Sequence, residues 1–291
     1  LWSLAADSRG NLYVGSGDEG KVFRIPKGGA GSLFHATGDL AVQALAVDSR
    51  DNLYAGTSPE GKVYRLSPDG KADVWFEPGE RYIWALAVDR SGNLYVATGE
   101  QGIIYKVSDK GKGTPFFDSE ESHIVALAFD RQGSLLAGSS GKGLLYRISP
   151  DGKGTVVLDT PLKEVNALAL DAAGRIYASG IQAETPAFPR LMTGARARRA
   201  AGREEAVVAV TPGGGPTLSE TVGEEAEVIA GPDPSVGPDG RQIRSQVYRI
   251  ETDGTATVAW SSESETVFSL AVAGEKDLFL GTGDQGKIRR L

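Results

Sequence analysis

The chain has no cysteine, one methionine and two histidines among its 291 residues. The lack of cysteine excludes disulfides, thiolate metal ligands and a cysteine nucleophile. No apolar run approaches the roughly 18 residues of a membrane-spanning helix, so we expect no membrane span. The net charge of −7 lacks the basic excess of a phosphate-backbone-binding surface, so we expect no nucleic-acid partner.

A repeat organises the whole chain. The phrase LAADSRGNLY at Leu4 returns as LAVDSRDNLY at Leu45 and as LAVDRSGNLY at Leu86. One aspartate marks each of five copies, at intervals of 41 residues: Asp7, Asp48, Asp89, Asp130 and Asp171. A sixth copy, from Ser269, lies 102 residues after the fifth, which is one period plus an insertion. A repeat array counts as one unit, so we expect residues 1–291 to form a single domain.

Each repeat divides into four short runs, which in the second copy read QALAVD, NLYAGT, GKVYRL and KADVWF. Each run has the length and composition of a β-strand, and turn-forming residues separate the runs. Four antiparallel strands per repeat, with no helical stretch, are typical of a β-propeller blade. We therefore predict an all-β propeller with six visible four-stranded blades of about 41 residues. The last copy stops before its outer strand, so we expect a segment of a longer chain, and a larger propeller stays open.

Two stretches, residues 15–20 and 281–286, match the glycine-rich pattern G-x-G-x-x-G of dinucleotide-binding proteins. That pattern needs a helix directly after it, whereas here a strand follows. We therefore interpret both stretches as hairpin turns and expect no nucleotide cofactor. The last glycine of this turn recurs at Gly20, Gly61, Gly102, Gly143 and Gly286, and we expect a positive φ at all five.

The five repeated aspartates are carboxylates and invite a metal-binding interpretation. They lie one per blade at the start of a tight turn, where an aspartate usually accepts backbone N–H groups. We therefore expect a structural role for them and no metal site. The sequence contains no recognised catalytic signature, so we expect no catalytic residue and no cofactor.

Because the strands run up and down, the loop before each first strand and the loop between the second and third strands share one face. We call it the loop face, and we call the opposite one the turn face. Repeat positions on the loop face vary while the framework stays fixed, which is where a propeller can hold a ligand. The candidate binding residues are Arg81, Tyr82, Trp84, Glu121, His123, Glu164 and Asn166. They offer aromatic surface and titratable groups for a protein, peptide or glycan, and a plain solvated rim is the alternative.

The insertion occupies residues 181–245, between the second and third strands of blade 5. It is rich in Ala, Gly and Pro, with an arginine block followed by a glutamate block. This low-complexity composition indicates a disordered tether, with a lid over the channel or a partner-docking arm as alternatives. We expect trypsin to cut there first, at Arg190, Arg196, Arg198, Arg199 or Arg203.

The phrase D-x-x-G-N-L-Y-V-x-T-G-x-x-G, as in the stretch from Asp89, resembles NHL-type repeats and bacterial propellers similar to virginiamycin B lyase and gluconolactonase. The resemblance covers all six blades but not the insertion, and it implies the propeller fold. It also implies, for the lyases and lactonases, a metal held at the channel by carboxylates with Asn or His. Only His123, Glu164 and Asn166 match a fragment of such a ligand set.

Two functions follow from these observations. The first is a non-catalytic binding or scaffold module that recognises a protein, peptide or glycan, as part of a larger exported bacterial protein. The second is a metal-dependent lyase or lactonase with its ion in the central channel. We expect a monomer and favour an extracytoplasmic or secreted location.

Overall fold

The computed structural model describes residues 1–182, 242–274, 277–283 and 286–291. Strands, turns and loops make up these residues, which contain no helix. In this part of the chain, accordingly, no helix is long and apolar enough to cross a membrane. Most of the predicted insertion lies outside the described residues, as do all its predicted trypsin sites. The strand before the insertion, β18, ends at Ile181, and the strand after it, β19, begins at Ser245.

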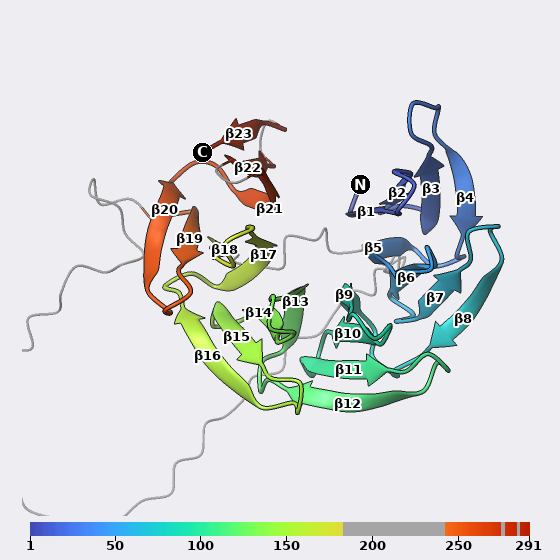
Figure 1. Cartoon of the computed structure of the whole chain (residues 1–291), viewed down its shortest axis with the longest axis horizontal. Helices are drawn as coiled ribbons and strands as arrows, with labels where there is room; N and C mark the ends of the chain where they lie inside the picture. The colour runs from blue at the N-terminus through green and yellow to red at the C-terminus, as the bar shows by residue number, and fades with distance from the viewer. Residues whose placement is uncertain (183–241, 275–276, 284–285) are drawn as a thin grey trace, which may run out of the picture. The chain divides into compact units, whose positions relative to one another are not determined.

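The strands form six antiparallel blades in chain order (Figure 1). Blade 1 contains β1 (Ser3–Ala6), β2 (Leu12–Gly15), β3 (Lys21–Ile25) and β4 (Ser32–Ala36). Blade 2 contains β5 (Ala41–Val47), β6 (Leu53–Ser58), β7 (Val63–Leu66) and β8 (Ala72–Phe76). Blade 3 contains β9 (Ile83–Val88), β10 (Leu94–Thr98), β11 (Ile103–Val107) and β12 (Gly113–Asp118). Blade 4 contains β13 (His123–Phe129), β14 (Leu135–Ser140), β15 (Leu144–Ile148) and β16 (Gly154–Asp159).

Blade 5 contains β17 (Glu164–Leu170), β18 (Ile176–Ile181), β19 (Ser245–Ile250) and β20 (Ala256–Ser262). Blade 6 contains β21 (Val267–Ala273), β22 (Asp277–Thr282) and β23 (Ile288–Arg290). The predicted propeller is thus confirmed, with four strands in five blades and three in the last. Blades 4 and 5 join into one continuous sheet, because Ser140 at the end of β14 pairs with Glu164 at the start of β17.

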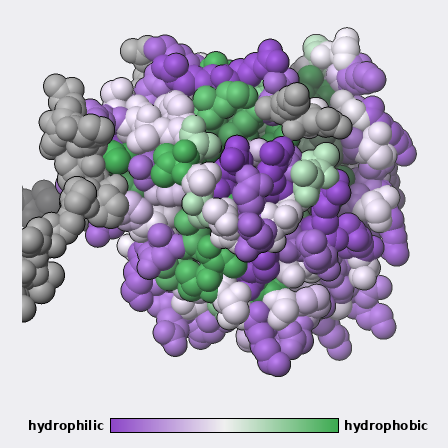
Figure 2. Space-filling model, turned by 60° about the vertical axis from the view of Figure 1, so that its left-hand side comes forward, coloured by the Kyte–Doolittle hydropathy of each residue, from purple (hydrophilic) through white to green (hydrophobic). Residues whose placement is uncertain are grey.

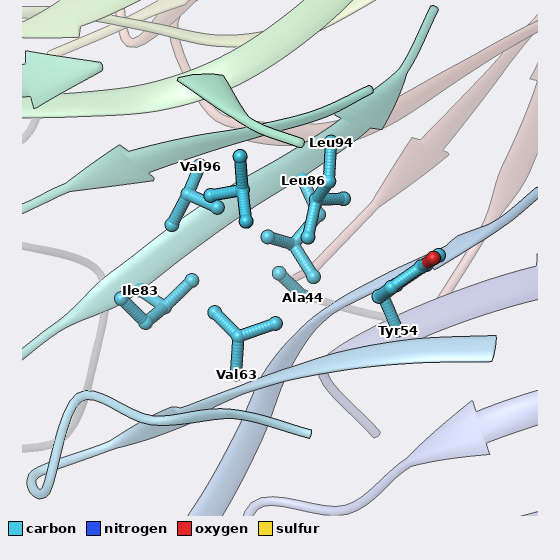
Figure 3. Packing of buried hydrophobic residues seen from close by; sticks show 8 residues of the cluster. Ala44, Tyr54, Val63, Ile83, Leu86, Leu94 and Val96 are labelled. Carbon is cyan, nitrogen blue, oxygen red and sulfur yellow. The ribbon is translucent and has the colours of Figure 1, made fainter. Parts of the chain in front are cut away.

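The hydrophobic core lies between neighbouring blades, whose first strands contact one another in chain order. Figure 3 shows Ala44, Tyr54 and Val63 of blade 2 facing Leu86 and its neighbours in blade 3. Small alanines on one face of each inner strand fit because blades converge towards the axis. The same alternation recurs between the following blades, so each blade depends on its neighbours for burial.

The two end blades each have one face without a neighbouring blade in the described residues (Figure 1). Leu4 of blade 1 is 65% exposed, whereas Leu86, at the same repeat position, is 9% exposed. On the other side, Ile288 of blade 6 is 78% exposed, and its counterpart Val63 is fully buried. Apolar groups also reach the surface elsewhere, and Figure 2 shows them in separate patches among hydrophilic side chains.

Both turn predictions hold. Each repeated aspartate accepts at least one backbone N–H group of its own turn, as Asp89 does from Ser91 at 2.9 Å and Asn93 at 2.8 Å. Gly102 has φ +59°, and a Cβ there would lie 2.0 Å from the carbonyl oxygen of Glu121. The other four predicted positions, Gly20, Gly61, Gly143 and Gly286, also have positive φ. The stretch at residues 15–20 therefore joins the paired strands β2 and β3, and Gly20 lies close to the backbone of Asp39 before blade 2. The second stretch lies partly outside the described residues, and a Cβ on Gly286 would meet nothing within 4 Å.

Candidate functional site

Three of the predicted site residues meet on the loop face. Tyr82 precedes β9 and stacks on Trp84, with ring centroids 5.0 Å apart and planes 8° from parallel. Trp84 in turn meets His123 of blade 4 edge to face, at 5.7 Å. The indole N–H of Trp84 donates to Nδ1 of His123 at 3.1 Å. The cluster therefore spans the boundary between blades 3 and 4.

The hydrogen bonds of His123 fix its protonation. Nδ1 accepts from the indole of Trp84 and from the backbone N–H of Glu100 at 3.2 Å. Two donors at Nδ1 leave the ring proton on Nε2, so the imidazole is neutral. Burial lowers the pKa of His123 further, although the nearby carboxylate of Glu100 opposes that shift. His123 therefore presents one N–H donor to its surroundings and has its basic nitrogen occupied.

Arg81 and Glu100 complete the cluster. The guanidinium of Arg81 lies 5.4 Å above the Tyr82 ring and 3.6 Å from the carboxylate of Glu100. Glu100 adopts φ +69°, a left-handed conformation that is uncommon for a residue other than glycine. Tyr82 is thus in contact with both the Trp84 ring and the Arg81 guanidinium.

A glycine just after the second strand of the same blade makes room for each aromatic at the position of Trp84. A Cβ on Gly99 would lie 2.5 Å from the indole nitrogen of Trp84. Gly17 is similarly close to Trp2, and Gly283 to Phe268. The blades that carry Gln43, Val125 or Asn166 at this position have Ser58, Ser140 or Ile181 in place of the glycine. This pairing of an aromatic residue with a glycine is visible in the sequence. It is the signal that predicts the close approach of Trp84 to Gly99.

Glu164 occupies in blade 5 the repeat position that His123 occupies in blade 4. Ser140 pairs with both residues, so they flank it on either side. Glu164 is only 3% exposed, and its Oε2 has no hydrogen-bond partner within the described residues. Val125 stands where Trp84 stands one blade earlier, and it has no donor to offer. Burial therefore raises the pKa of Glu164, and a hydrogen bond from Ser140 offsets the shift in part.

Asn166 turns towards blade 6 instead of joining the aromatic cluster. Its Nδ2 donates to the carbonyl of Val267 at 2.9 Å, which fixes the orientation of the amide. The buried Oδ1 then faces away from this partner and has no donor within the described residues. Asn166 therefore links blades 5 and 6 through its amide N–H, and its Oδ1 acceptor stays unpaired within the described residues.

Glu121 is held in a local ion pair. It is 6% exposed, and its carboxylate accepts the backbone N–H of Lys142 at 3.1 Å and lies 3.2 Å from the Lys142 ammonium. Both contacts come from the loop between β14 and β15. Glu121 therefore ties this loop to the loop between β12 and β13, and its charge is compensated within the chain.

Besides Glu121 Oε1, which is ion-paired with Lys142, four buried oxygens on the loop face lack any hydrogen-bond donor within the described residues. They are Gln43 Oε1, Glu164 Oε2, Asn166 Oδ1 and Gln182 Oε1. Two of them, on Gln43 and Gln182, belong to residues outside the predicted site. Buried polar atoms in folded proteins are nearly always paired, so a group of unpaired acceptors needs an explanation.

The donor set of this face does not fit a divalent metal ion. The basic nitrogen of His123 is occupied, burial raises the pKa of Glu164 and so disfavours its ligating carboxylate form, and Glu121 is paired with Lys142. Within the described residues, no three side chains of His, Cys, Asp or Glu gather closely enough to hold a metal. Metal sites need deprotonated and available ligands, and these described side chains fit that requirement poorly.

The fold and its varied loop face define a β-propeller protein. No protein-family model and no curated protein sequence matches the chain. Its fold matches a streptogramin B lyase structure with a TM-score of 0.69 at 11% identity, covering 99% of this chain and 77% of the lyase. The virginiamycin B lyase of Staphylococcus aureus matches with a TM-score of 0.67 at 11% identity, covering 100% and 83%.

A putative gluconolactonase matches with a TM-score of 0.51 at 18% identity, over 60% of this chain and 69% of the other. Identities this low show a shared fold and leave the activity of this chain open. The resemblance read from the repeat phrase is thereby confirmed at the level of the fold.

Proposed function

We propose that this chain is a non-catalytic binding module that recognises a protein, peptide or glycan on its loop face. The observation that carries the proposal is the set of four buried oxygens without donors, in blades 2 and 5. Leaving such oxygens unpaired costs about 1 to 3 kcal/mol each. A ligand that moves the covering side chains aside and brings N–H or O–H donors would recover that cost. Peptide amides and sugar hydroxyls both supply such donors.

The metal-dependent lyase or lactonase is the alternative, because the fold neighbours include a streptogramin B lyase and a putative gluconolactonase. One virginiamycin B lyase structure is described as catalytically inactive through a histidine-to-alanine change, with quinupristin bound. A histidine is thus important for activity in that protein. His123 differs from a free catalytic base because Trp84 and Glu100 both donate to its Nδ1. This arrangement supports a binding role over a catalytic one.

The test is a screen of peptide and glycan arrays with the purified protein, followed by one variant. Glu164→Met removes an unpaired acceptor and its buried carboxyl while keeping a side chain of similar length. We expect it to weaken binding of a captured ligand at least tenfold without lowering the melting temperature. Asp69→Ala, at an exposed position on the turn face, serves as the control and should bind as the unmodified protein does.

Binding that survives Glu164→Met and disappears with Asp69→Ala would place the functional site on the turn face. Turnover of a lactone or a streptogramin by the metal-supplemented protein would replace the binding proposal with the enzymatic alternative.

A further inference from the structure

The turn face carries a carboxylate-binding arrangement that the chain itself fills between blades 1 and 2. The backbone N–H of Ser8 donates to Asp51 Oδ1 at 2.9 Å, and the Ser8 hydroxyl donates to Asp51 Oδ2 at 2.8 Å. Arg9 adds its guanidinium, 3.6 Å from Asp51 Oδ2. Asp51 adopts φ +62°. At the same turn position, blades 3, 4 and 5 have Gly92, Gly133 and Gly174. The chain therefore accepts an unfavourable backbone conformation to place a carboxylate on this Ser-Arg pair.

The same Ser-Arg pair recurs one blade later without its carboxylate. Asp48-Ser49-Arg50 repeats Asp7-Ser8-Arg9, but Gly92 stands at the repeat position of Asp51. Within the described residues, neither the backbone N–H nor the hydroxyl of Ser49 forms a hydrogen bond, and the guanidinium of Arg50 has no carboxylate partner. The donors that hold Asp51 are thus duplicated and left open between blades 2 and 3.

A cavity of about 250 Å³ occupies this place. Ser49, Arg50 and Gly92 line it, and two further arginines, Arg65 and Arg90, join them. Arg65 lies 4.5 Å over the Trp75 ring, and Arg90 donates to the carbonyl of Arg131 at 3.4 Å. Within the described residues, none of the three arginines has a carboxylate partner, so the cavity gathers positive charge.

Arg65 remains without a carboxylate because the aspartate of its own blade is occupied. Asp48 Oδ2 accepts from the Asn52 amide at 2.8 Å and from the Tyr54 hydroxyl at 3.3 Å. Blade 4 has Ser134 and Leu136 at these two positions, neither of which donates a side-chain hydrogen bond to its aspartate. There, Arg147 Nε lies 3.3 Å from Asp130 Oδ2. The sequence of blade 2 thus keeps the Arg65 guanidinium available.

We propose that the cavity between blades 2 and 3 is an anion site that takes an oxyanion group, a carboxylate or a phosphate, in the place of the Asp51 carboxylate. The oxyanion accepts from the backbone N–H and hydroxyl of Ser49, as Asp51 does from Ser8, and the guanidinium groups of Arg50, Arg65 and Arg90 compensate its charge. Two cavity-lining carboxylates, on Asp48 and Asp109, limit the net positive charge. The site lies on the turn face, so it is independent of the ligand proposed for the loop face.

The test uses the whole chain at low ionic strength, titrated with inorganic phosphate and separately with acetate by isothermal titration calorimetry. We expect one anion per chain, with binding that weakens as sodium chloride is added. Gly92→Asp supplies the chain's own carboxylate in the manner of Asp51 and should weaken anion binding at least tenfold. Tighter binding of phosphate identifies a tetrahedral anion and tighter binding of acetate a carboxylate, and both outcomes support the site.

Arg65→Gln provides a second variant in case Gly92→Asp disturbs the turn, and it should also weaken binding at least tenfold. Arg147→Gln removes the arginine at the same repeat position in blade 4, which already pairs with Asp130, and should leave binding unchanged. Failure of both anions to bind the unmodified protein would overturn the proposal. Equal loss of binding in Arg65→Gln and Arg147→Gln would also overturn it, because the effect would then be one of general charge.

Discussion

Trp84 on β9 donates its indole N–H to Nδ1 of His123 on β13 at 3.1 Å, so one hydrogen bond joins blades 3 and 4 at the loop face. This bond and the one from Glu100 hold the imidazole in its neutral form with the proton on Nε2. The bond therefore contributes to the state of the histidine as well as to the packing of the two blades.

Replacing the donor should change the titration of that histidine. Trp84→Phe keeps a ring in place but removes the N–H, so Nδ1 becomes easier to protonate and the pKa of His123 should rise. The measurement is a pH titration of the imidazole resonances by NMR. His35 on β4 is the other histidine of the chain and serves as an internal reference, since it should titrate unchanged. A lower pKa of His123 in the variant would contradict the assigned tautomer.

The exposed face of blade 1 gives a matched pair for the packing between blades. Leu86→Ala removes a side chain buried between blades 2 and 3, so we expect a loss of roughly 2 to 5 kcal/mol in the free energy of unfolding. Leu4→Ala changes the same repeat position where the leucine is 65% exposed, so its cost should be below about 1 kcal/mol. Denaturant unfolding of both variants measures the difference. Equal losses would mean that a partner covers Leu4 in solution.

The repeat made the blade predictable, because its four strands, its aspartate turns and its positive-φ glycines all depend on residues close together in the sequence. The contact of Trp84 with His123 was harder to predict, since it depends on how one blade lies against the next. Their common neighbour Glu100 contributes a backbone N–H, a group that every residue has and that no sequence pattern marks. The place of Asn166 illustrates the same limit, because its partner is a backbone carbonyl of another blade, at Val267.

Sequence comparison within the chain was nevertheless more informative than any single motif. The exchange of Trp84 for Val125 one blade later explains why Glu164 lacks the donor that His123 has. The exchange of Asp51 for Gly92 leaves Ser49 and Arg50 without the carboxylate that their counterparts bind. Such differences acquire a physical meaning only when the blade-to-blade register shows which positions face each other.

The raised pKa of Glu164 makes a prediction about pH. Since the folded chain binds this proton more tightly than the unfolded chain does, the stability that the proton confers is present at low pH. It is lost as the pH rises from the unfolded pKa, near 4.5, through the raised folded pKa. Glu164→Gln removes the cost of burying a charged carboxylate, so at pH 7 the melting temperature of the variant should rise by roughly 2 to 4 °C per kcal/mol gained. Near pH 4 the variant and the unmodified protein should melt at the same temperature. Differential scanning calorimetry at the two pH values measures the effect.

Glu60→Gln alters an exposed glutamate on the same face and should shift the melting temperature little at either pH. A Glu164→Gln variant that is less stable at pH 7 than the unmodified protein would show that the carboxylate has a cationic partner in solution.

A last pair of variants compares a glycine of a fingerprint-like turn, Gly102, with a glycine of an aspartate turn, Gly133. Gly102 and Gly133 both have positive φ, at +59° and +85°, but only Gly102 approaches the next blade. A Cβ on Gly102 would lie 2.0 Å from the backbone oxygen of Glu121, whereas a Cβ on Gly133 meets nothing within 4 Å. Gly133→Ala should therefore cost only the backbone strain, about 1 kcal/mol, while Gly102→Ala adds a clash with a backbone that cannot easily move and should cost roughly 3 kcal/mol or more. Urea unfolding of the two variants compares them directly, and equal costs would mean that the β10–β11 loop does not rest on the loop between β12 and β13.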